Sequence, residues 1–124
     1  MEKINHATHM KTIFCDIDGC VFYHYGNIKQ IMSEEASILP GVQEKFYEWH
    51  NQGYTIILTT GRPESLRNFT EKELCKFGLF YNQLIMNLPR GQRIIINDIK
   101  PKSKEKMAVA FNLKRNKGMK NVDI

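Results

Sequence analysis

Residues 11–19 read KTIFCDIDG, a short apolar run that ends in two acids and a glycine. A run of this length and composition predicts a strand buried on both faces, and the closing glycine predicts a sharp turn. Asp16 and Asp18 are two residues apart, so a continued strand would point both carboxylates to the same side. Carboxylates that close repel each other unless a cation lies between them. The stretch therefore predicts a buried strand whose carboxyl end carries a pair of acids.

Strand-like and helix-like segments alternate along the rest of the chain. Pro40 suits the first turn of a helix, and apolar residues recur at helical spacing from there until Gly53 supplies a stop. A second helix with the same spacing is expected from Glu64 to Phe77. Apolar runs predict further strands over residues 54–59, 83–87 and 93–97. Residues 107–113 alternate larger apolar and smaller side chains, which favours a strand over a helix, and residues 21–31 lack helical period and predict an irregular or hairpin-like flap.

Strands that alternate with helices indicate βαβ crossovers, and therefore a mostly parallel sheet. The expected fold class is α/β, a three-layer, doubly wound, Rossmann-like sheet, because strands buried on both faces have continuously apolar sequences. With 124 residues, 42% of them hydrophobic, the chain has the size of one domain, expected over residues 11–124. No apolar run approaches the roughly 18–20 residues that span a bilayer, which excludes a membrane protein.

The N-terminus and the cysteines both bear on location. Residues 1–10 contain one Lys and no apolar segment, so they are not a secretory signal, and we expect a disordered leader or a tag remnant there. A native arm is the alternative. The three cysteines (Cys15, Cys20 and Cys75) are odd in number and show no CxxC spacing. This usage is typical of a reducing compartment, and a cytoplasmic location is expected.

Polar and charged residues follow three of the expected strands. Ligands of open parallel sheets bind beyond the carboxyl ends of the strands. At these ends the sequence places Asp16 and Asp18, then Thr60, Gly61 and Arg62, and then Asp98 and Lys100. Three carboxylates at one edge suit a hard cation such as Mg²⁺, which takes oxygen ligands and keeps several waters. A bare pair of acids is as often a solvated turn, but the other two strand ends favour a site.

The segments FCDIDG (14–19), ILTTGR (57–62) and IIND (95–98) resemble the first, second and fourth motifs of the haloacid dehalogenase-like (HAD) phosphohydrolase superfamily. The resemblance implies that Asp16 is the nucleophile that forms an aspartyl-phosphate, and that Asp18 is first the general acid and then the base. It further implies that Asp98, together with Asp16 and Asp18, holds Mg²⁺. In the second motif, the resemblance implies that Thr60 binds the phosphoryl group and that Arg62 approaches the phosphate or the substrate. A solvated Arg62 at the start of a helix is the alternative.

The third motif of the superfamily, a Lys or Arg ahead of the fourth strand, has no single counterpart here. Arg90 and Arg93 are the candidates by position, and Lys100 is a third source of the cation. Cys20 stands where the superfamily has Thr or Val, and Asn97 replaces a second acid of the fourth motif. The Asn97 departure predicts a metal held more loosely or through an extra water.

Only 20 residues separate Gly19 from Pro40, too few for a cap domain, so the resemblance implies a small capless member with an open site. An open site favours a macromolecular substrate or a neighbouring subunit that serves as the lid. We expect a homo-oligomer in which a neighbour's flap around residues 22–25, or its basic C-terminal stretch, borders the site. A monomer is the alternative, and His24 is either part of the gate or packing of the flap.

The expected function is Mg²⁺-dependent hydrolysis of a small phosphomonoester. Residues 93–101 and 108–115 resemble a capless group found among bacterial surface-polysaccharide and sugar-phosphate genes, which implies a phosphorylated sugar or sugar acid, with Asn112 and Arg115 as further contacts. The net charge of +5 and eight Lys and Arg between residues 100 and 120 keep a polynucleotide-end phosphatase as an alternative. Phe111 is the one aromatic there, so nucleic acid is the less favoured partner. A non-catalytic binding module with this fold is the third hypothesis.

Overall fold

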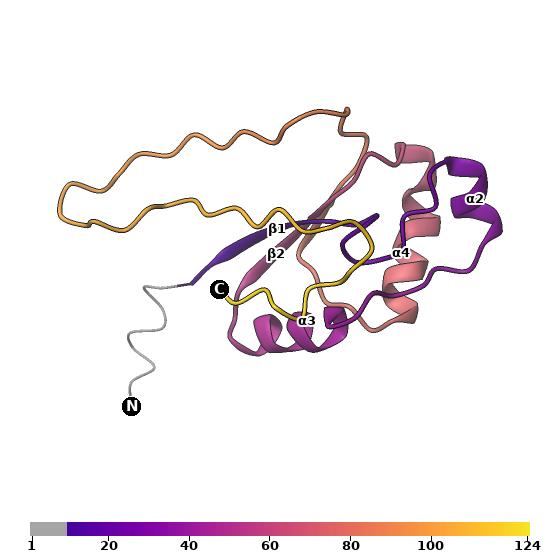
Figure 1. Ribbon diagram of the computed structural model, residues 1–124, viewed down its shortest axis with the longest axis horizontal. Coiled ribbons are helices and arrows are strands. Elements are labelled where there is room, and N and C mark those ends of the chain that lie inside the picture. Colours follow the sequence, from indigo (N-terminus) through magenta and orange to yellow (C-terminus); the bar gives the residue numbers. More distant parts are fainter. Residues whose placement is uncertain (1–9) are drawn as a thin grey trace.

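The computed structural model describes residues 10–124, so nearly all of the leader expected over residues 1–10 lies outside the described part. Its sheet has the order β1-β2-β3, formed by β1 (Thr12–Asp16), β2 (Thr55–Thr59) and β3 (Gln83–Ile85), all parallel (Figure 1). Asp16 pairs with Thr59 and Thr59 pairs with Ile85, so the three strands end level with one another. This arrangement confirms the α/β class and the first three expected strands.

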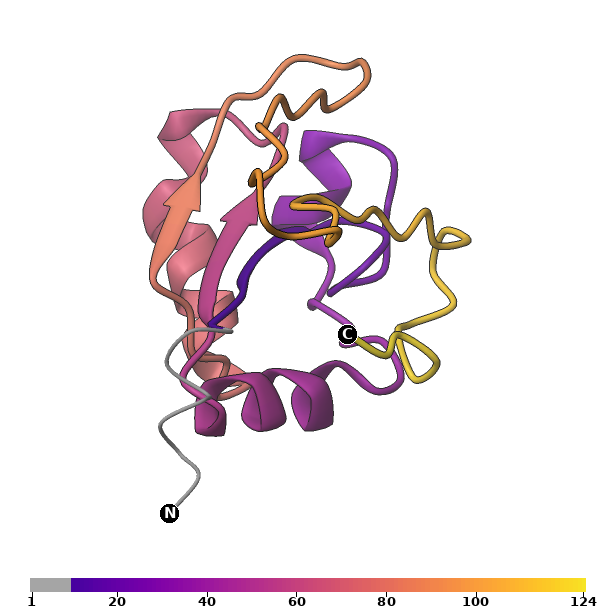
Figure 2. The ribbon, with the colours of Figure 1, turned by 90° about the vertical axis from the view of Figure 1, so that its left-hand side faces the viewer.

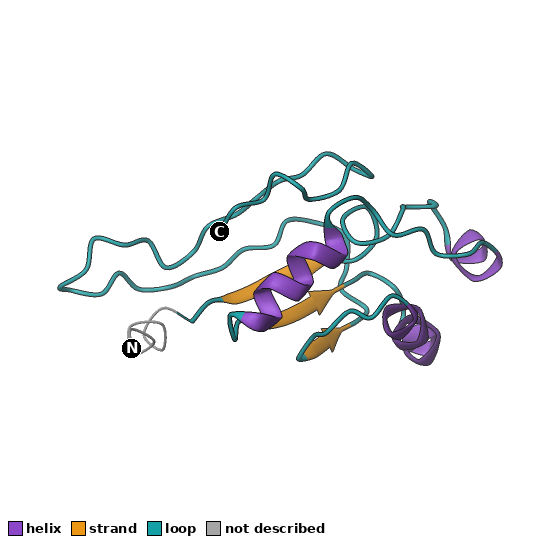
Figure 3. Cartoon of the chain, turned by 90° about the horizontal axis from the view of Figure 1, so that it is seen from below, coloured by secondary structure: helices purple, strands orange, loops and turns teal. Residues whose placement is uncertain are grey.

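Each connection between these strands carries a helix, as the alternating pattern predicts. From β1 to β2 runs α3 (Val42–Asn51), which lies across the sheet (Figure 3); from β2 to β3 run the 3-10 turn η1 (Glu64–Leu66) and α4 (Arg67–Lys76). The helix α3 begins after Gly41, whose φ is 84° and where a side chain would lie 2.8 Å from the Lys120 backbone, so glycine is required. Within residues 10–124, no helix has the length and apolar character needed to cross a membrane.

The two faces of the sheet are buried to different degrees. Side chains alternate along a strand, and those on one face contribute Ile56, Leu58 and Leu84 to the core. On the opposite face, Phe14 is 56% exposed and Ile85 is 38% exposed. Among the described residues β1 pairs only with β2. The sheet therefore has an open face and, along β1, a free edge.

The flap expected over residues 21–31 contains a short helix that the sequence pattern does not predict. This helix, α2 (Ile28–Ser33), begins where the side chain of Asn27 accepts a hydrogen bond from the Gln30 N–H at 2.9 Å, and it buries none of its residues. Phe22 is 1% exposed and packs on Phe77, with 5.5 Å between ring centroids. Phe22 is therefore a core residue rather than an exposed part of the flap.

The prediction of strands over residues 93–97 and 107–113 is wrong. Both segments belong to a long irregular stretch, residues 88–112, which we call the arm: it leaves the body beyond β3 and then returns to it (Figures 1 and 3). Ile94 is 76% exposed and Ile96 is 91% exposed. A strand needs a neighbour that pairs its backbone groups. Between the two limbs of the arm, the one hydrogen bond in the described chain runs from Asn97 Nδ2 to the Met107 carbonyl at 3.4 Å.

The C-terminal segment, residues 113–124, returns to the body beside the turn that follows β1 (Figure 2). Its Met119 and Val122 are buried in the core. Asn116, with φ of 63°, donates its N–H to the Gly19 carbonyl at 2.9 Å, and its Oδ1 accepts from the His24 N–H at 2.7 Å. One asparagine thus fixes both ends of the turn beside the paired acids.

Candidate active site

The carboxyl ends of β1 and β2 bring together the first two predicted motifs. Asp16 is the last residue of β1 and is exposed, and the Ile17 N–H donates to its Oδ1 at 3.1 Å. Thr60, one residue beyond β2, is 1% exposed and its N–H donates to the Ile85 carbonyl at 3.0 Å. The expectation that these strand ends meet at one edge is met for residues 16–18 and 60–62.

Four neighbours and its own partial burial set the electrostatics of Asp16. Partial burial is the largest influence and raises the pKa of Asp16 above its usual range, and the negative charge of Asp18 adds to this. The Ile17 N–H and the charges of Arg93 and His24 act in the opposite direction. Of the three candidate cations, Arg90, Arg93 and Lys100, it is the charge of Arg93 that lowers the pKa of Asp16. The Arg93 guanidinium itself donates to the Pro89 and Gly91 carbonyls at 3.2 and 3.1 Å.

Asp18 is held by a buried guanidinium. Arg62 donates from Nε to Asp18 Oδ2 at 3.0 Å and from Nη2 to Asp18 Oδ1 at 2.8 Å. Its Nη1 donates to Glu73 Oε1 at 2.6 Å and to Thr70 Oγ1 at 3.0 Å. The side chain of Arg62 is 3% exposed. Burial opposes its charge, but the hydrogen bonds and charges of Asp18 and Glu73 more than compensate and raise the pKa of Arg62.

These contacts give Arg62 a different place from the one that the resemblance implies. Its guanidinium points inward to α4 and to Asp18, so in this conformation it orients Asp18 instead of reaching outward to a substrate. Thr60 Oγ1 accepts the Arg62 N–H at 3.1 Å, which ties the second motif into one turn. At Gly61 a side chain would lie 3.3 Å from the Leu88 carbonyl, so glycine allows the chain after β3 to approach closely.

Asp98 does not join Asp16 and Asp18. Its side chain is 73% exposed on the arm, where Lys100 Nζ lies 3.5 Å from its Oδ1. Nowhere in residues 10–124 do three His, Cys, Asp or Glu side chains come together in a way that could hold a metal ion. A single chain therefore does not supply the three carboxylates that the sequence predicts for Mg²⁺. The physical reason is the arm: without the expected fourth strand, nothing brings Asp98 back to the end of β1.

Residues that the sequence analysis missed complete the site. Glu73 and Thr70 come from one face of α4, three residues apart, and both bind Arg62. An acid at helical spacing within an otherwise apolar face was the available signal. Asn116, also missed, comes from the C-terminal segment. Its neighbour Arg115 is an expected substrate contact, and a Cβ on Gly19 would lie 3.4 Å from the Arg115 Cγ. Arg115 is thus beside the site, whereas Asn112 is exposed on the arm.

Comparisons with known proteins agree with this picture of the fold. Residues 24–124 match the model of the HAD superfamily, subfamily IIIB (acid phosphatase). The match covers most of the chain and begins after the paired acids. The chain belongs to this family.

Two solved structures are similar to part of this chain. One is the D,D-heptose 1,7-bisphosphate phosphatase from B. bronchiseptica, complexed with magnesium and phosphate. It is 21% identical with a TM-score of 0.51, and the match covers 66% of this chain and 51% of that chain. The other, from Vibrio cholerae, is assigned as a 3-deoxy-D-manno-octulosonate 8-phosphate phosphatase. It is 18% identical with a TM-score of 0.43, and the match covers 68% of this chain and 45% of that chain. The present chain thus spans about half the length of each. No curated protein matches the sequence.

Proposed function

We propose that the protein is a Mg²⁺-dependent phosphomonoesterase that works through an aspartyl-phosphate on Asp16. One observation carries the proposal: Asp16, an exposed residue whose carboxyl group is partly buried, ends β1 two positions before a second carboxylate that a buried arginine orients. Membership of an acid phosphatase family supports it. A nucleophile must be accessible, and Asp16 is. An acid–base group must have a fixed position, and Arg62 gives Asp18 one.

The proposed reaction has two steps. Asp16 attacks the phosphorus, the ester bond breaks, and the leaving oxygen takes a proton from Asp18. Water then attacks the aspartyl-phosphate and gives its proton to Asp18, which releases phosphate and restores both side chains. Arg62 occupies one acceptor site on each Asp18 oxygen, which leaves a second lone pair on each oxygen for the transferred proton. Glu73 and Thr70 remain as acceptors that keep the guanidinium in place while this happens.

The proposed substrate is a small phosphorylated sugar or sugar acid. The site is uncapped, since between β1 and α3 the described chain contains only α2. The cations Arg93 and Arg115 lie near Asp16 and Gly19 and suit a substrate with more than one anionic group. The structural neighbour that acts on a heptose bisphosphate is consistent with a sugar phosphate.

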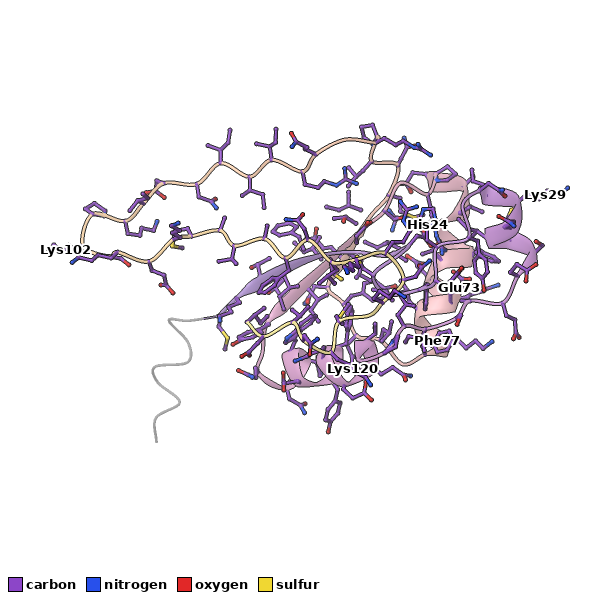
Figure 4. The ribbon with its side chains drawn as sticks, in the orientation of Figure 1. His24, Lys29, Glu73, Phe77, Lys102 and Lys120 are labelled. Carbon is purple, nitrogen blue, oxygen red and sulfur yellow. The ribbon has the colours of Figure 1, made fainter. Side chains whose placement is uncertain are left out.

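A polynucleotide end is the second candidate, because the tip of the arm is strongly basic. Lys100, Lys102, Lys104 and Lys106 are all exposed there, and Figure 4 shows Lys102 far out on the arm. Salt separates the two candidates. Hydrolysis of a polyanion would weaken steeply as salt rises, whereas that of a small sugar phosphate would change little.

A reducing compartment and a homo-oligomer complete the proposal. Cys15, Cys20 and Cys75 are free thiols, which supports the cytoplasm. Burial is the main cause that raises the pKa of Cys20 to about 11, so Cys20 is a poor nucleophile near neutral pH. The open site supports a neighbouring subunit as its border.

A substrate screen tests the function. The purified protein with Mg²⁺ is assayed for phosphate release from p-nitrophenyl phosphate, a panel of sugar phosphates and sugar-acid phosphates, and a 3′-phosphorylated oligonucleotide. We expect turnover of at least one sugar phosphate, absent in Asp16→Asn. Release of phosphate from none of them, by a folded protein, would leave only the non-catalytic binding module.

A further inference from the structure

The arm exposes an apolar surface that a single copy leaves uncovered. Ile94, Ile95, Ile96 and Ile99 on its outgoing limb are 76%, 54%, 91% and 71% exposed. Val109 and Phe111 on the returning limb are 74% and 48% exposed. Large exposed apolar surfaces on a protein commonly mark the place where something binds.

The strand β1 of the body has one edge that no other strand pairs with in the described chain. This strand pairs with β2 on one edge and, within residues 10–124, with nothing on the other. Phe14, in the middle of β1, is 56% exposed on the open face of the sheet. An unpaired edge with apolar side chains is a template for another strand. The five residues Arg93–Asn97, which carry the strand pattern, match the five of β1 in length.

The arm of the same copy is poorly placed to fill that edge in parallel. Its base is held at the carboxyl end of the sheet, where the Leu88 N–H donates to the Thr60 carbonyl at 3.1 Å and the Asn87 N–H to the Arg62 carbonyl at 2.8 Å. From there the outgoing limb runs opposite to β1, toward Lys102 at the tip (Figures 1 and 4). Parallel strands of one sheet need a connection of about a dozen residues or more, and only residues 86–92 separate β3 from Arg93.

We propose that two copies exchange their arms, so that residues 93–97 of each pair with β1 of the other and the partner's Asp98 completes the site at Asp16. A two-fold axis that sets the two β1 strands antiparallel makes each arm, which runs against its own β1, parallel to β1 of the partner. The arm then needs no reversal. With the partner's Asn97 beside Asp16, the partner's Asp98 comes one residue beyond the end of β1, level with the turn that carries Asp18.

The exchange accounts for three features at once. It pairs the free edge of β1, it covers Ile94–Ile96, and it supplies the third carboxylate that one chain keeps on the arm. The interface is isologous, because each copy gives an arm and receives one, so assembly stops at two copies. The inference deepens the proposed function by naming the partner that completes its site: a second copy of this chain.

Complementation between two inactive variants tests the exchange. Asp16→Asn and Asp98→Asn are co-expressed with different tags, and the mixed dimer is isolated by both tags in turn. In an exchanged dimer, Asp16 of one chain meets the intact Asp98 of the other at one of two sites, so about half of the wild-type activity returns. If Asp98 served its own chain, both sites would be defective and no activity above that of either variant would appear, which overturns the proposal. The mixed dimer of Asp16→Asn with Asp18→Asn is the matched control and stays inactive.

A second measurement does not depend on catalysis. Wild-type protein is expected to sediment as a dimer at micromolar concentration, with slow amide hydrogen exchange at residues 94–97. The double variant Ile94→Asp/Ile96→Asp is expected to be a folded monomer. Ile28→Asp, which changes a 48% exposed residue on α2, is expected to remain a dimer. A wild-type monomer overturns the exchange, whether or not those amides are protected and whether or not it is a phosphatase. A dimer with unprotected amides at 94–97 also overturns it.

Discussion

Arg62 binds both carboxylate oxygens of Asp18, with Nε 3.0 Å from Oδ2 and Nη2 2.8 Å from Oδ1, although the two residues are 44 positions apart. This fork joins the turn after β1 to the turn after β2. The same guanidinium continues to Glu73 and Thr70 on α4. One buried arginine thus fixes the two strand ends and the following helix relative to one another, and the position of Asp18 depends on all of them.

Glu73→Ala is expected to destabilise the fold. The Glu73 side chain is 12% exposed and lies 2.6 Å from the Arg62 Nη1, so its removal leaves a buried guanidinium with less compensation. Breaking a buried pair in this way costs about 3–5 kcal/mol. The free energy of unfolding in urea measures the loss.

The matched control is Glu71→Ala, two residues earlier on the same helix. Glu71 pairs with Arg67 at 3.6 Å, and both side chains are more than a third exposed. We expect a change within about 0.5 kcal/mol. Equal losses for the two variants would contradict the importance assigned to the Arg62 network.

Asp16→Asn is expected to stabilise the metal-free fold at neutral pH. The pKa of Asp16 is raised in the folded protein, mainly by burial, so folding disfavours the charged form. The stability that this group contributes is present below its unfolded pKa and is lost as the pH rises through the folded pKa. The difference between variant and wild type should therefore grow from acid to neutral pH. Thermal unfolding with EDTA from pH 4 to pH 7 checks this, and a difference that shrinks toward pH 7 would have the wrong sign.

The same substitution is expected to remove catalysis. Asparagine keeps the shape of Asp16 but cannot form the aspartyl-phosphate, so kcat should fall by about a thousandfold or more. The exposed Asp123→Asn at the C-terminus is the control and should keep full activity. More than a tenth of wild-type turnover in Asp16→Asn would show that another group is the nucleophile.

Chelation is expected to silence the enzyme reversibly. EDTA should abolish phosphate release, and Mg²⁺ should restore it, because a phosphoryl group approaching two carboxylates needs its charge neutralised. EDTA saturated beforehand with Mg²⁺ controls for other effects of the chelator. Activity that survives EDTA would assign the charge neutralisation to Arg93 and its neighbours.

The sequence predicted the body of the molecule well because local patterns and tertiary packing agree there. The apolar run into Asp16, the helix start at Pro40 and the second motif at residues 60–62 all carry short-range signals that burial then satisfies. The inward turn of Arg62 was not predictable in the same way. It depends on Glu73, whose distance from Asp18 in the sequence gives no hint that one guanidinium binds both.

The arm is the part that the sequence misplaced. Residues 93–97 have the composition of a buried strand, but a strand pattern says only that a segment favours a sheet, not which strand it pairs with. Within one copy the connection from β3 is too short to bring the segment back in parallel, so Asp98 stays on the arm. The position of Asp98 was inferred from that strand, and the two predictions failed together.

Asn116 holds the turn after β1 through its backbone N–H and its side chain. Asn116→Ala removes the acceptor of the His24 N–H and places alanine at a φ of 63°, which favours glycine and asparagine. Asn116→Gly relieves the backbone strain but still lacks the acceptor. If the hydrogen bond from the His24 N–H to Asn116 Oδ1 positions the turn with Asp18 and Gly19, both variants lower kcat/KM by about tenfold. Only the alanine variant also lowers the free energy of unfolding, by about 1–2 kcal/mol, because alanine disfavours the left-handed backbone. Steady-state kinetics and urea unfolding of the two variants separate these effects. A glycine variant with wild-type kinetics would show that Asn116 is needed for its backbone conformation alone.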